Sequence, residues 1–217
     1  MKYVPLRQNW YYSPVNIPNL AEIQKEMLFY YNRKYEYSKA FNPKYINIFK
    51  RTMNEQDYPA TAEYLKSVGL YDKFYRILLS QNQSNAPDDN VKTEETTTGP
   101  AVHVDTVDPY ECQFSLNIPL QNCNNSYIGF FKTSTPEMLK PAFLENDKRH
   151  GSNFAWMPAQ YAEEITRAEM IQPILVNTTI LHRGISDNAD RAICCFRFKP
   201  ELTDDDIARL GIIIPLT

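Results

Sequence analysis

The sequence predicts a mainly β protein with α-helical support, in the form of a β-barrel or jelly roll buttressed by helices. Helical periodicity marks the first third of the chain, and many short runs typical of strands follow it. Aromatic residues make up 13 % of the chain while glycine occurs only 6 times, a balance that favours strands around a thick aromatic core. The length of 217 residues fits one such unit, because single all-β domains often run to ~200–250 residues.

The composition excludes several classes of protein. Hydrophobic residues (43 %) and charged residues (23 %) occur in the proportions of an ordinary globular protein. The net charge of -3 argues against a nucleic-acid-binding protein, which usually presents a basic surface. No apolar run approaches the ~18 residues of a membrane-spanning helix, and the start of the chain lacks the apolar stretch of a signal peptide. We therefore expect a cytoplasmic protein with no membrane or nucleic-acid partner, and the oligomeric state stays open.

The four cysteines, at positions 112, 123, 194 and 195, have no C-x-x-C spacing. A zinc ribbon or a thioredoxin-type motif is therefore excluded. Cys194 and Cys195 are neighbours, so on a strand they would point to opposite faces. In a reducing compartment we expect these two to be free thiols in the core.

Residues 1–73 are predicted to form a helical N-terminal support. Asn19 and Glu22 form a capping pair in front of apolar residues that recur at helical spacing. A second helix is bracketed by Pro59 in its first turn and Gly69 just past its end, the positions where these residues are favoured.

Residues 74–199 are predicted to form the β core, and residues 200–217 a C-terminal helix and tail that begins after Thr203 as N-cap. All three parts belong to one domain. The polar run 81–99 is a loop whose length is typical of a functional cover, and we expect it near the mouth of the site. Residues 133–170 show no clear pattern. The strand candidates are 74–80, 102–106, 112–119, 127–132, 174–177, 179–183 and 191–199.

Three residues suggest a metal centre. His103 and Asp105 lie two positions apart in a run typical of a strand, so their side chains project from the same face. His182 follows an apolar run and is predicted to lie on a strand and point inward. Two histidines and one carboxylate are the ligand set of non-haem Fe(II) sites, where they leave three coordination positions open. Taken alone, His182 fits a hydrogen-bonded core histidine better than a metal ligand.

An arginine follows nine residues after His182 and opens an apolar strand. Arg191 is costly in such a place unless it meets an anion, and its planar fork fits a carboxylate. We expect a hairpin between His182 and Arg191 that puts the guanidinium beside the metal. Arg197 lies six residues further on and on the same strand face. It and Asn117 are candidates for contacts with a bound cosubstrate, and Tyr110 is a candidate for the substrate pocket.

His103-x-Asp105, His182 and Arg191 together resemble the pattern of the Fe(II)/2-oxoglutarate-dependent oxygenases, notably the prolyl-hydroxylase-like and phytanoyl-CoA-dioxygenase-like branches. The resemblance covers residues 74–199. It implies a double-stranded β-helix core of the jelly-roll, cupin-like kind. It also implies Fe(II) bound by the three ligands, which would be the catalytic residues.

The same resemblance implies 2-oxoglutarate as cosubstrate, with Arg191 on its distal carboxylate, and O₂ as co-reactant. Arg197 and Asn117 are candidates for further contacts with this cosubstrate from their place on the strand faces, although an arginine such as Arg197 more often extends to the rim in a structural role. The expected reaction is hydroxylation of a small molecule or of an amino-acid or peptidyl side chain. Two alternatives stay open: a cupin-type metal enzyme that does not use 2-oxoglutarate, and an inactive β-barrel that serves as a binding module. The intact ligand set with Arg191 speaks against the second.

Overall fold

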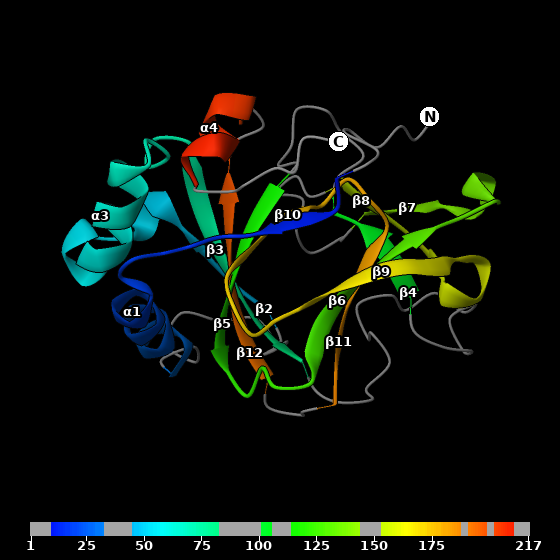
Figure 1. Ribbon diagram of the computed structural model, residues 1–217, viewed down its shortest axis with the longest axis horizontal. Coiled ribbons are helices and arrows are strands. Elements are labelled where there is room, and N and C mark those ends of the chain that lie inside the picture. Colours follow the sequence, from blue (N-terminus) through cyan, green and yellow to red (C-terminus); the bar gives the residue numbers. More distant parts are fainter. Residues whose placement is uncertain are drawn as a thin grey trace.

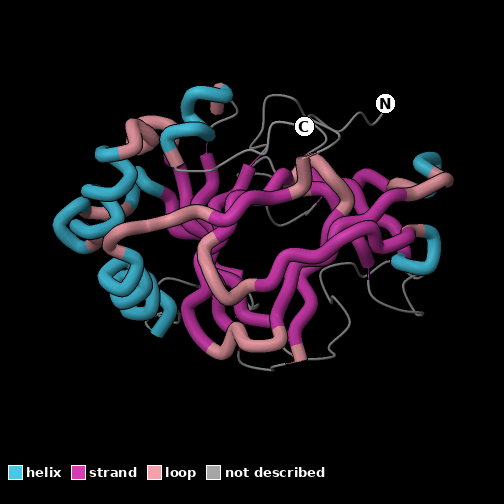
Figure 2. Tube along the Cα trace, in the orientation of Figure 1, coloured by secondary structure: helices cyan, strands magenta, loops and turns pink. Residues whose placement is uncertain are grey.

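The computed structural model describes residues 10–32, 45–82, 101–105, 114–143, 153–187, 191–198 and 202–210. Within these ranges the strands form two antiparallel six-stranded sheets that face each other, and the longer helices lie on the outer side of one of them (Figures 1 and 2). The predicted mainly β fold with helical support is confirmed at this level.

The first sheet contains the most deeply buried strands. All eight residues of its central strand β12 are buried, because helices cover one face and the second sheet covers the other. In spatial order the strands are β1 (Tyr12–Pro14), β10 (Ile174–Asn177), β5 (Phe114–Gln121), β12 (Arg191–Phe198), β3 (Phe74–Asn82) and β2 (Tyr45–Phe49).

The second sheet carries the candidate metal ligands. Its central strand β11 pairs with β4 on one side and β6 on the other. In spatial order the strands are β7 (Lys140–Phe143), β8 (Asn153–Pro158), β4 (Ala101–Val104), β11 (His182–Ser186), β6 (Ser126–Lys132) and β9 (Glu163–Glu169).

The helices support the outer face of the first sheet (Figure 1). Glu26 joins the first two, because its carboxylate accepts hydrogen bonds from Ala60 N (2.6 Å), Thr61 N (3.0 Å) and the Thr61 hydroxyl (2.7 Å). Gly69, at φ 70°, ends the second helix as predicted. The helices are α1 (Leu20–Asn32), α3 (Pro59–Ser67) and α4 (Asp204–Arg209), and the short 3₁₀ turns are η1 (Lys50–Thr52), η2 (Glu55–Asp57), η3 (Pro136–Met138) and η5 (Ala159–Tyr161).

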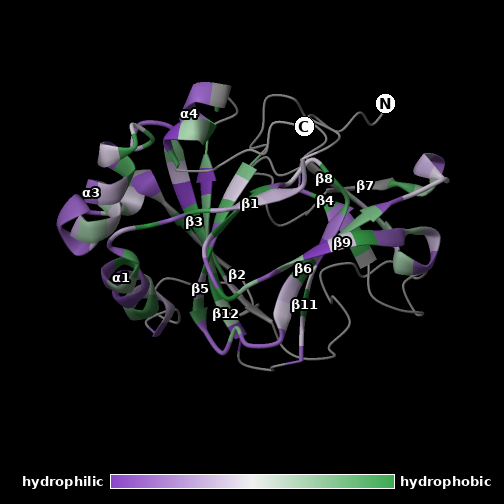
Figure 3. Cartoon of the chain, viewed as in Figure 1, coloured by the Kyte–Doolittle hydropathy of each residue, from purple (hydrophilic) through white to green (hydrophobic). Residues whose placement is uncertain are grey.

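Hydrophobic residues recur along the strands (Figure 3), and alternation divides the side chains between a core beneath the helices and a core between the sheets. On β5, Phe114, Leu116 and Ile118 pack in the core beneath the helices, whereas Ser115 and Asn117 lie on the face toward the second sheet. Cys194 and Cys195 divide between the same two faces, as predicted. Cys123, Cys194 and Cys195 are free thiols, while Cys112 lies outside the described residues.

Two expectations about the elements need correction, and one region without an assignment is resolved into strands. The segment 1–73 is not purely helical, because β1 pairs with β10 and β2 pairs with β3 at the edges of the first sheet. The predicted strand 179–183 begins only at His182, since residues 178–180 form a turn. The unassigned region 133–170 holds β7, β8 and β9.

Other expectations hold or lie outside the described ranges. Thr203 caps α4 as predicted, and Asp206 completes a reciprocal capping box with it. Strand β3 extends to Asn82, and the remainder of the predicted loop, residues 83–99, lies outside the described residues. Among the described residues, none of the helices has the length and apolar character needed to cross a membrane.

Candidate metal centre

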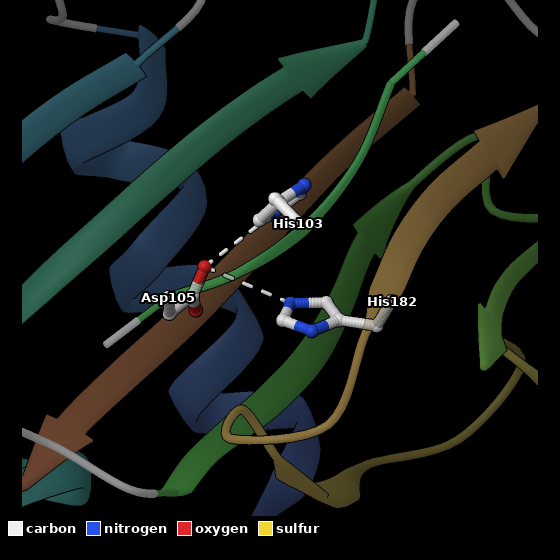
Figure 4. Close-up of side chains that lie close together, drawn as sticks. All are labelled: His103, Asp105 and His182. Carbon is white, nitrogen blue, oxygen red and sulfur yellow. Dashed lines mark ion pairs between the residues drawn. The ribbon is translucent and has the colours of Figure 1, made fainter. Parts of the chain in front are cut away.

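His103, Asp105 and His182 come together on the inner face of the second sheet (Figure 4). His103 on β4 and His182 on β11 lie directly opposite each other in register, and their ring centroids are 4.6 Å apart. Asp105 Oδ1 lies 3.3 Å from His103 Nε2 and 3.6 Å from His182 Nε2. The sequence predicted this grouping, and one potential ligand atom from each residue lies within 4.8 Å of the others.

Asp105 is held by backbone as well as by its side chain. It follows the last residue of β4, and its amide donates to the Thr178 carbonyl at 3.0 Å. Thr178 belongs to the turn between β10 and β11. That turn is fixed in its own right, because Asn177 Oδ1 accepts hydrogen bonds from the Thr179 amide and hydroxyl. The turn therefore positions both Asp105 and the start of the strand that carries His182.

His182 presents a lone pair to the cluster. Its Nδ1 lies 2.8 Å from the Ile180 carbonyl, which can only accept, so Nδ1 carries the proton and Nε2 is left as the ligand atom. Burial lowers the pKa of His182 to about 4 against the attraction of Asp105. The imidazole is therefore neutral near pH 7, the form that binds a metal.

Asp105 carries a negative charge in this site. Burial by itself would raise the pKa of the carboxyl, but the Arg197 guanidinium and the two histidines outweigh it and hold the pKa well below its ordinary range. Arg197 Nη1 donates directly to Asp105 Oδ2. Because Arg197 takes one oxygen, the other is turned toward the histidines.

The donor set fits a divalent transition metal. An ion that three N and O ligands hold at ~2.1 Å and at right angles places those atoms ~3 Å from one another. The two measured separations, 3.3 and 3.6 Å, are close to that value. The side chains of His103 and Asp105 are 29 % and 19 % exposed, so the cluster is open to solvent on one side. The arrangement can thus hold an ion and leave coordination positions accessible.

Arg191 reaches the same strand as His182, but not through the predicted hairpin. Strands β11 and β12 belong to different sheets, so Arg191 extends across the interior, where its Nη1 donates to the Ile185 carbonyl at 3.2 Å. It is only 2 % exposed. A Cβ on Gly184 would lie 3.1 Å from Arg191 Nη2, so the missing side chain makes room for the guanidinium. The hairpin expectation was wrong because nearness in sequence does not decide which sheet a strand joins.

The remaining candidate residues have different outcomes. Arg197 lies on the inner face, as expected from its spacing to Arg191, but its observed partner is Asp105. Asn117 lies on the inner face of β5, opposite Cys195, and accepts a hydrogen bond from Ser115. Tyr110 lies outside the described residues.

Sequence reasoning missed one charged residue of this interior. Arg76 on β3 lies directly opposite Arg197 and is 8 % exposed. It stands in an aliphatic and aromatic strand, just as Arg191 does. An arginine in an apolar strand was the signal that identified Arg191, and the same signal applied to residues 74–82 would have found Arg76.

Comparison with known proteins gives little further information. No protein family model matches the chain, and no curated protein matches it. Among solved structures it is similar to the crystal structure of AviO1 from Streptomyces viridochromogenes Tue57, with 12 % sequence identity and a TM-score of 0.42, over 89 % of this chain and 91 % of that chain. A likeness this distant says nothing about activity, so the function has to be inferred from the site.

Proposed function

We propose that the chain is an Fe(II)- and 2-oxoglutarate-dependent oxygenase with a double-stranded β-helix core, which hydroxylates a small molecule or an amino-acid-type side chain. The observation that carries the proposal is the His103–Asp105–His182 cluster, with the buried Arg191 guanidinium against the strand that bears His182. A metal site alone fits many enzymes. The buried Arg191 guanidinium lies against Gly184 and Ile185, two and three residues along β11 from His182, and so adds a partner for an anionic cosubstrate.

When bound, the metal would supply oxidation chemistry with 2-oxoglutarate and O₂ as co-reactants. One oxygen atom of O₂ would go to a C–H bond of the substrate and the other to succinate, with release of CO₂. The chain's residues have separate tasks in this scheme. Asp105 and the two histidines occupy three coordination positions and leave three for the reactants. His182 is fixed in its ligating tautomer by Ile180.

Arg191 is suited to the distal carboxylate of 2-oxoglutarate. Its guanidinium is buried, so a bidentate pair with a carboxylate would form away from water, where charge-assisted hydrogen bonds are strongest. Gly184 leaves the space that this guanidinium needs beside β11. Arg197 has a different task, because it already bonds the metal-ligand carboxylate and fixes how Asp105 is turned.

The test measures metal, cosubstrate and product in turn. Protein prepared without oxygen is titrated with Fe(II) and then with 2-oxoglutarate, and the visible charge-transfer absorption and equilibrium dialysis are followed. Succinate is then measured in air. We expect one iron per chain, binding of 2-oxoglutarate, and slow succinate formation even without substrate.

Matched variants make the result specific. His103→Ala and His182→Ala each remove one of three ligands, so neither should retain stoichiometric iron, while circular dichroism should stay that of the parent. Arg167→Ala, on an exposed side chain of β9, should behave as the parent. Iron binding without 2-oxoglutarate binding would favour a cupin-type metal enzyme, and binding of neither would favour a non-catalytic binding module. Full iron occupancy in both histidine variants would refute the ligand assignment.

A further inference from the structure

Three arginines are buried among the described residues, and all three lie on the inner face of the first sheet: Arg76, Arg191 and Arg197. Arg197 bonds Asp105, and Arg191 lies against β11. Arg76 has neither contact. A buried cation that has no evident structural use is a candidate for binding a ligand.

The register fixes where Arg76 lies. It alternates with Leu78, which packs in the core between the sheets, so Arg76 shares that face. On β12 its directly opposite neighbour is Arg197. Residues opposite each other in an antiparallel pair have Cα atoms only ~4.5–5.5 Å apart, and like charges in such a pair repel. Arg76 is therefore the direct cross-strand neighbour of Arg197, the arginine that bonds the Asp105 carboxylate.

The contacts of Arg76 do not neutralise its charge. The Nε atom of Arg76 is buried without a hydrogen-bond partner, and the Arg76 side chain forms no hydrogen bond or ion pair with the described residues. Its recorded contact is with the ring of Tyr75, whose centroid lies 5.4 Å from Arg76 Cζ. An aromatic face attracts a cation but carries no charge of its own. The guanidinium thus keeps the hydrogen-bonding capacity that an oxyanion would use.

We propose that Arg76 binds an anionic group of the substrate, a carboxylate or a phosphate, next to Arg197 and the metal centre. This inference rests on the proposed function. That function places one end of 2-oxoglutarate on the metal and the other end on Arg191, so neither end is available to Arg76. The anion left for Arg76 then belongs to the molecule that is oxidised. The planar fork of a guanidinium suits either oxyanion in bidentate fashion. The substrate class is accordingly an acidic small molecule or metabolite rather than a neutral one.

The test uses protein loaded with Zn(II), which does no redox chemistry, and saturated with 2-oxoglutarate. Three probes that share one chain and differ in the head group are titrated by calorimetry: hexanoate, hexyl phosphate and the neutral hexanamide. We expect hexanoate or hexyl phosphate to bind ~10-fold or more tightly than hexanamide, and the stronger of the two identifies the anion. Arg76→Gln should lose that preference, Arg76→Lys should keep part of it, and Arg167→Gln should keep all of it.

Thermal stability separates a binding role from a structural one. Removing a buried charge without an ionic partner should leave the melting temperature unchanged or raise it, so Arg76→Gln and Arg76→Met should be at least as stable as the parent. Loss of the anion preference at equal or higher stability supports the proposal. Equal binding of all three probes by the parent overturns it, as does an unchanged preference in Arg76→Gln. The proposal is also overturned if the preference for anionic probes is lost and the melting temperature falls in all three variants, Arg76→Gln, Arg76→Met and Arg76→Lys. Arg76 would then have a structural role.

The two proposals fail in different ways. Binding of 2-oxoglutarate is measured first in the same calorimeter. If it binds and the probes show no preference for an anion, the inference on Arg76 is wrong and the oxygenase proposal stands. If 2-oxoglutarate does not bind and the probes still depend on Arg76, the oxygenase proposal fails and an anion site remains.

Discussion

Arg197 and Asp105 form an ion pair that joins the two sheets: Nη1 of the arginine on β12 donates to Oδ2, while Oδ1 of the same carboxylate faces both histidines. The pair therefore fixes which oxygen is offered to a metal. Arg197 comes from the strand that also carries Arg191, so β12 contributes both to the orientation of a ligand and to the proposed anchor of the cosubstrate.

Arg197→Ala should weaken metal binding. The arginine orients a ligating carboxylate, and the loss of such a partner typically costs ~10–100-fold in metal affinity. We expect a loss within that range in a competition titration of Fe(II) or Zn(II) against a chelator. Arg167→Ala is the control. Metal affinity equal to that of the parent would show that Asp105 keeps its orientation without Arg197.

The three candidate metal ligands could be predicted from the sequence, because the local pattern around each one indicates which way its side chain points. His103 and Asp105 are two apart beside a strand, and His182 follows a strongly apolar run, so the inward direction of each side chain follows from alternation. The role of Arg197 could not be read in this way. Its contact with Asp105 depends on how two sheets lie against each other, and no local pattern encodes that.

The elements that were missed are short or lie at edges. Strand β1 has three residues and ends in Pro14, and β9 alternates mostly exposed and half-buried residues, so neither gives the apolar signal of a central strand. The opposed position of Arg76 and Arg197 is likewise set by pairing between residues far apart in the chain. Local patterns thus predicted the mainly β fold and the grouping of His103, Asp105 and His182, while the register decided which charged residues surround that group.

Asp206→Asn should destabilise the protein through the C-terminal helix. The Asp206 carboxylate accepts hydrogen bonds from the Thr203 amide (2.7 Å) and hydroxyl (2.8 Å) and pairs with Lys73, just before β3. We expect a loss of about 1–2 kcal/mol in the free energy of unfolding at pH 7, measured by urea denaturation. Asp205→Asn, on an exposed neighbour in the same helix, is the matched control.

The pH dependence of that loss has a definite sign. Burial would raise the pKa of Asp206, but the hydrogen bonds with Lys73 and Thr203 outweigh it and lower the pKa. A carboxyl with a lowered folded-state pKa contributes stability above its unfolded pKa of ~3.9 and loses that contribution as pH falls through the folded value. The difference in the free energy of unfolding between the parent and Asp206→Asn should therefore have its maximum value at pH 7 and decrease below pH ~4. A difference independent of pH from 7 to 3 would contradict an ionised Asp206 as its source.

Gly184→Ala should weaken 2-oxoglutarate binding without affecting the metal. The new Cβ would lie 3.1 Å from Arg191 Nη2, so the guanidinium must shift by a few tenths of an ångström. Because a long side chain can yield, we expect a several-fold rise in the Kd for 2-oxoglutarate, smaller than that caused by removal of Arg191. Equilibrium dialysis with iron-loaded protein measures both affinities. A fall in iron affinity instead would mean that the substitution disturbs β11 and His182.

Arg191→Ala should separate the cosubstrate site from the metal site. Removing one partner of a buried charge pair typically costs ~2–5 kcal/mol, which corresponds to a rise in Kd on the order of 30-fold or more. We expect that rise for 2-oxoglutarate, with iron affinity nearly unchanged, because the Arg191 guanidinium bonds the Ile185 carbonyl, three residues along β11 from His182. Arg191→Lys should recover only part of the affinity, since an ammonium group lacks the planar fork. If Arg191→Ala binds 2-oxoglutarate as the parent does and Arg197→Ala, with its metal saturated, does not, then Arg197 is the anchor. If neither substitution changes the affinity, 2-oxoglutarate is not held by β12, and the cosubstrate part of the proposal fails while the metal centre stands.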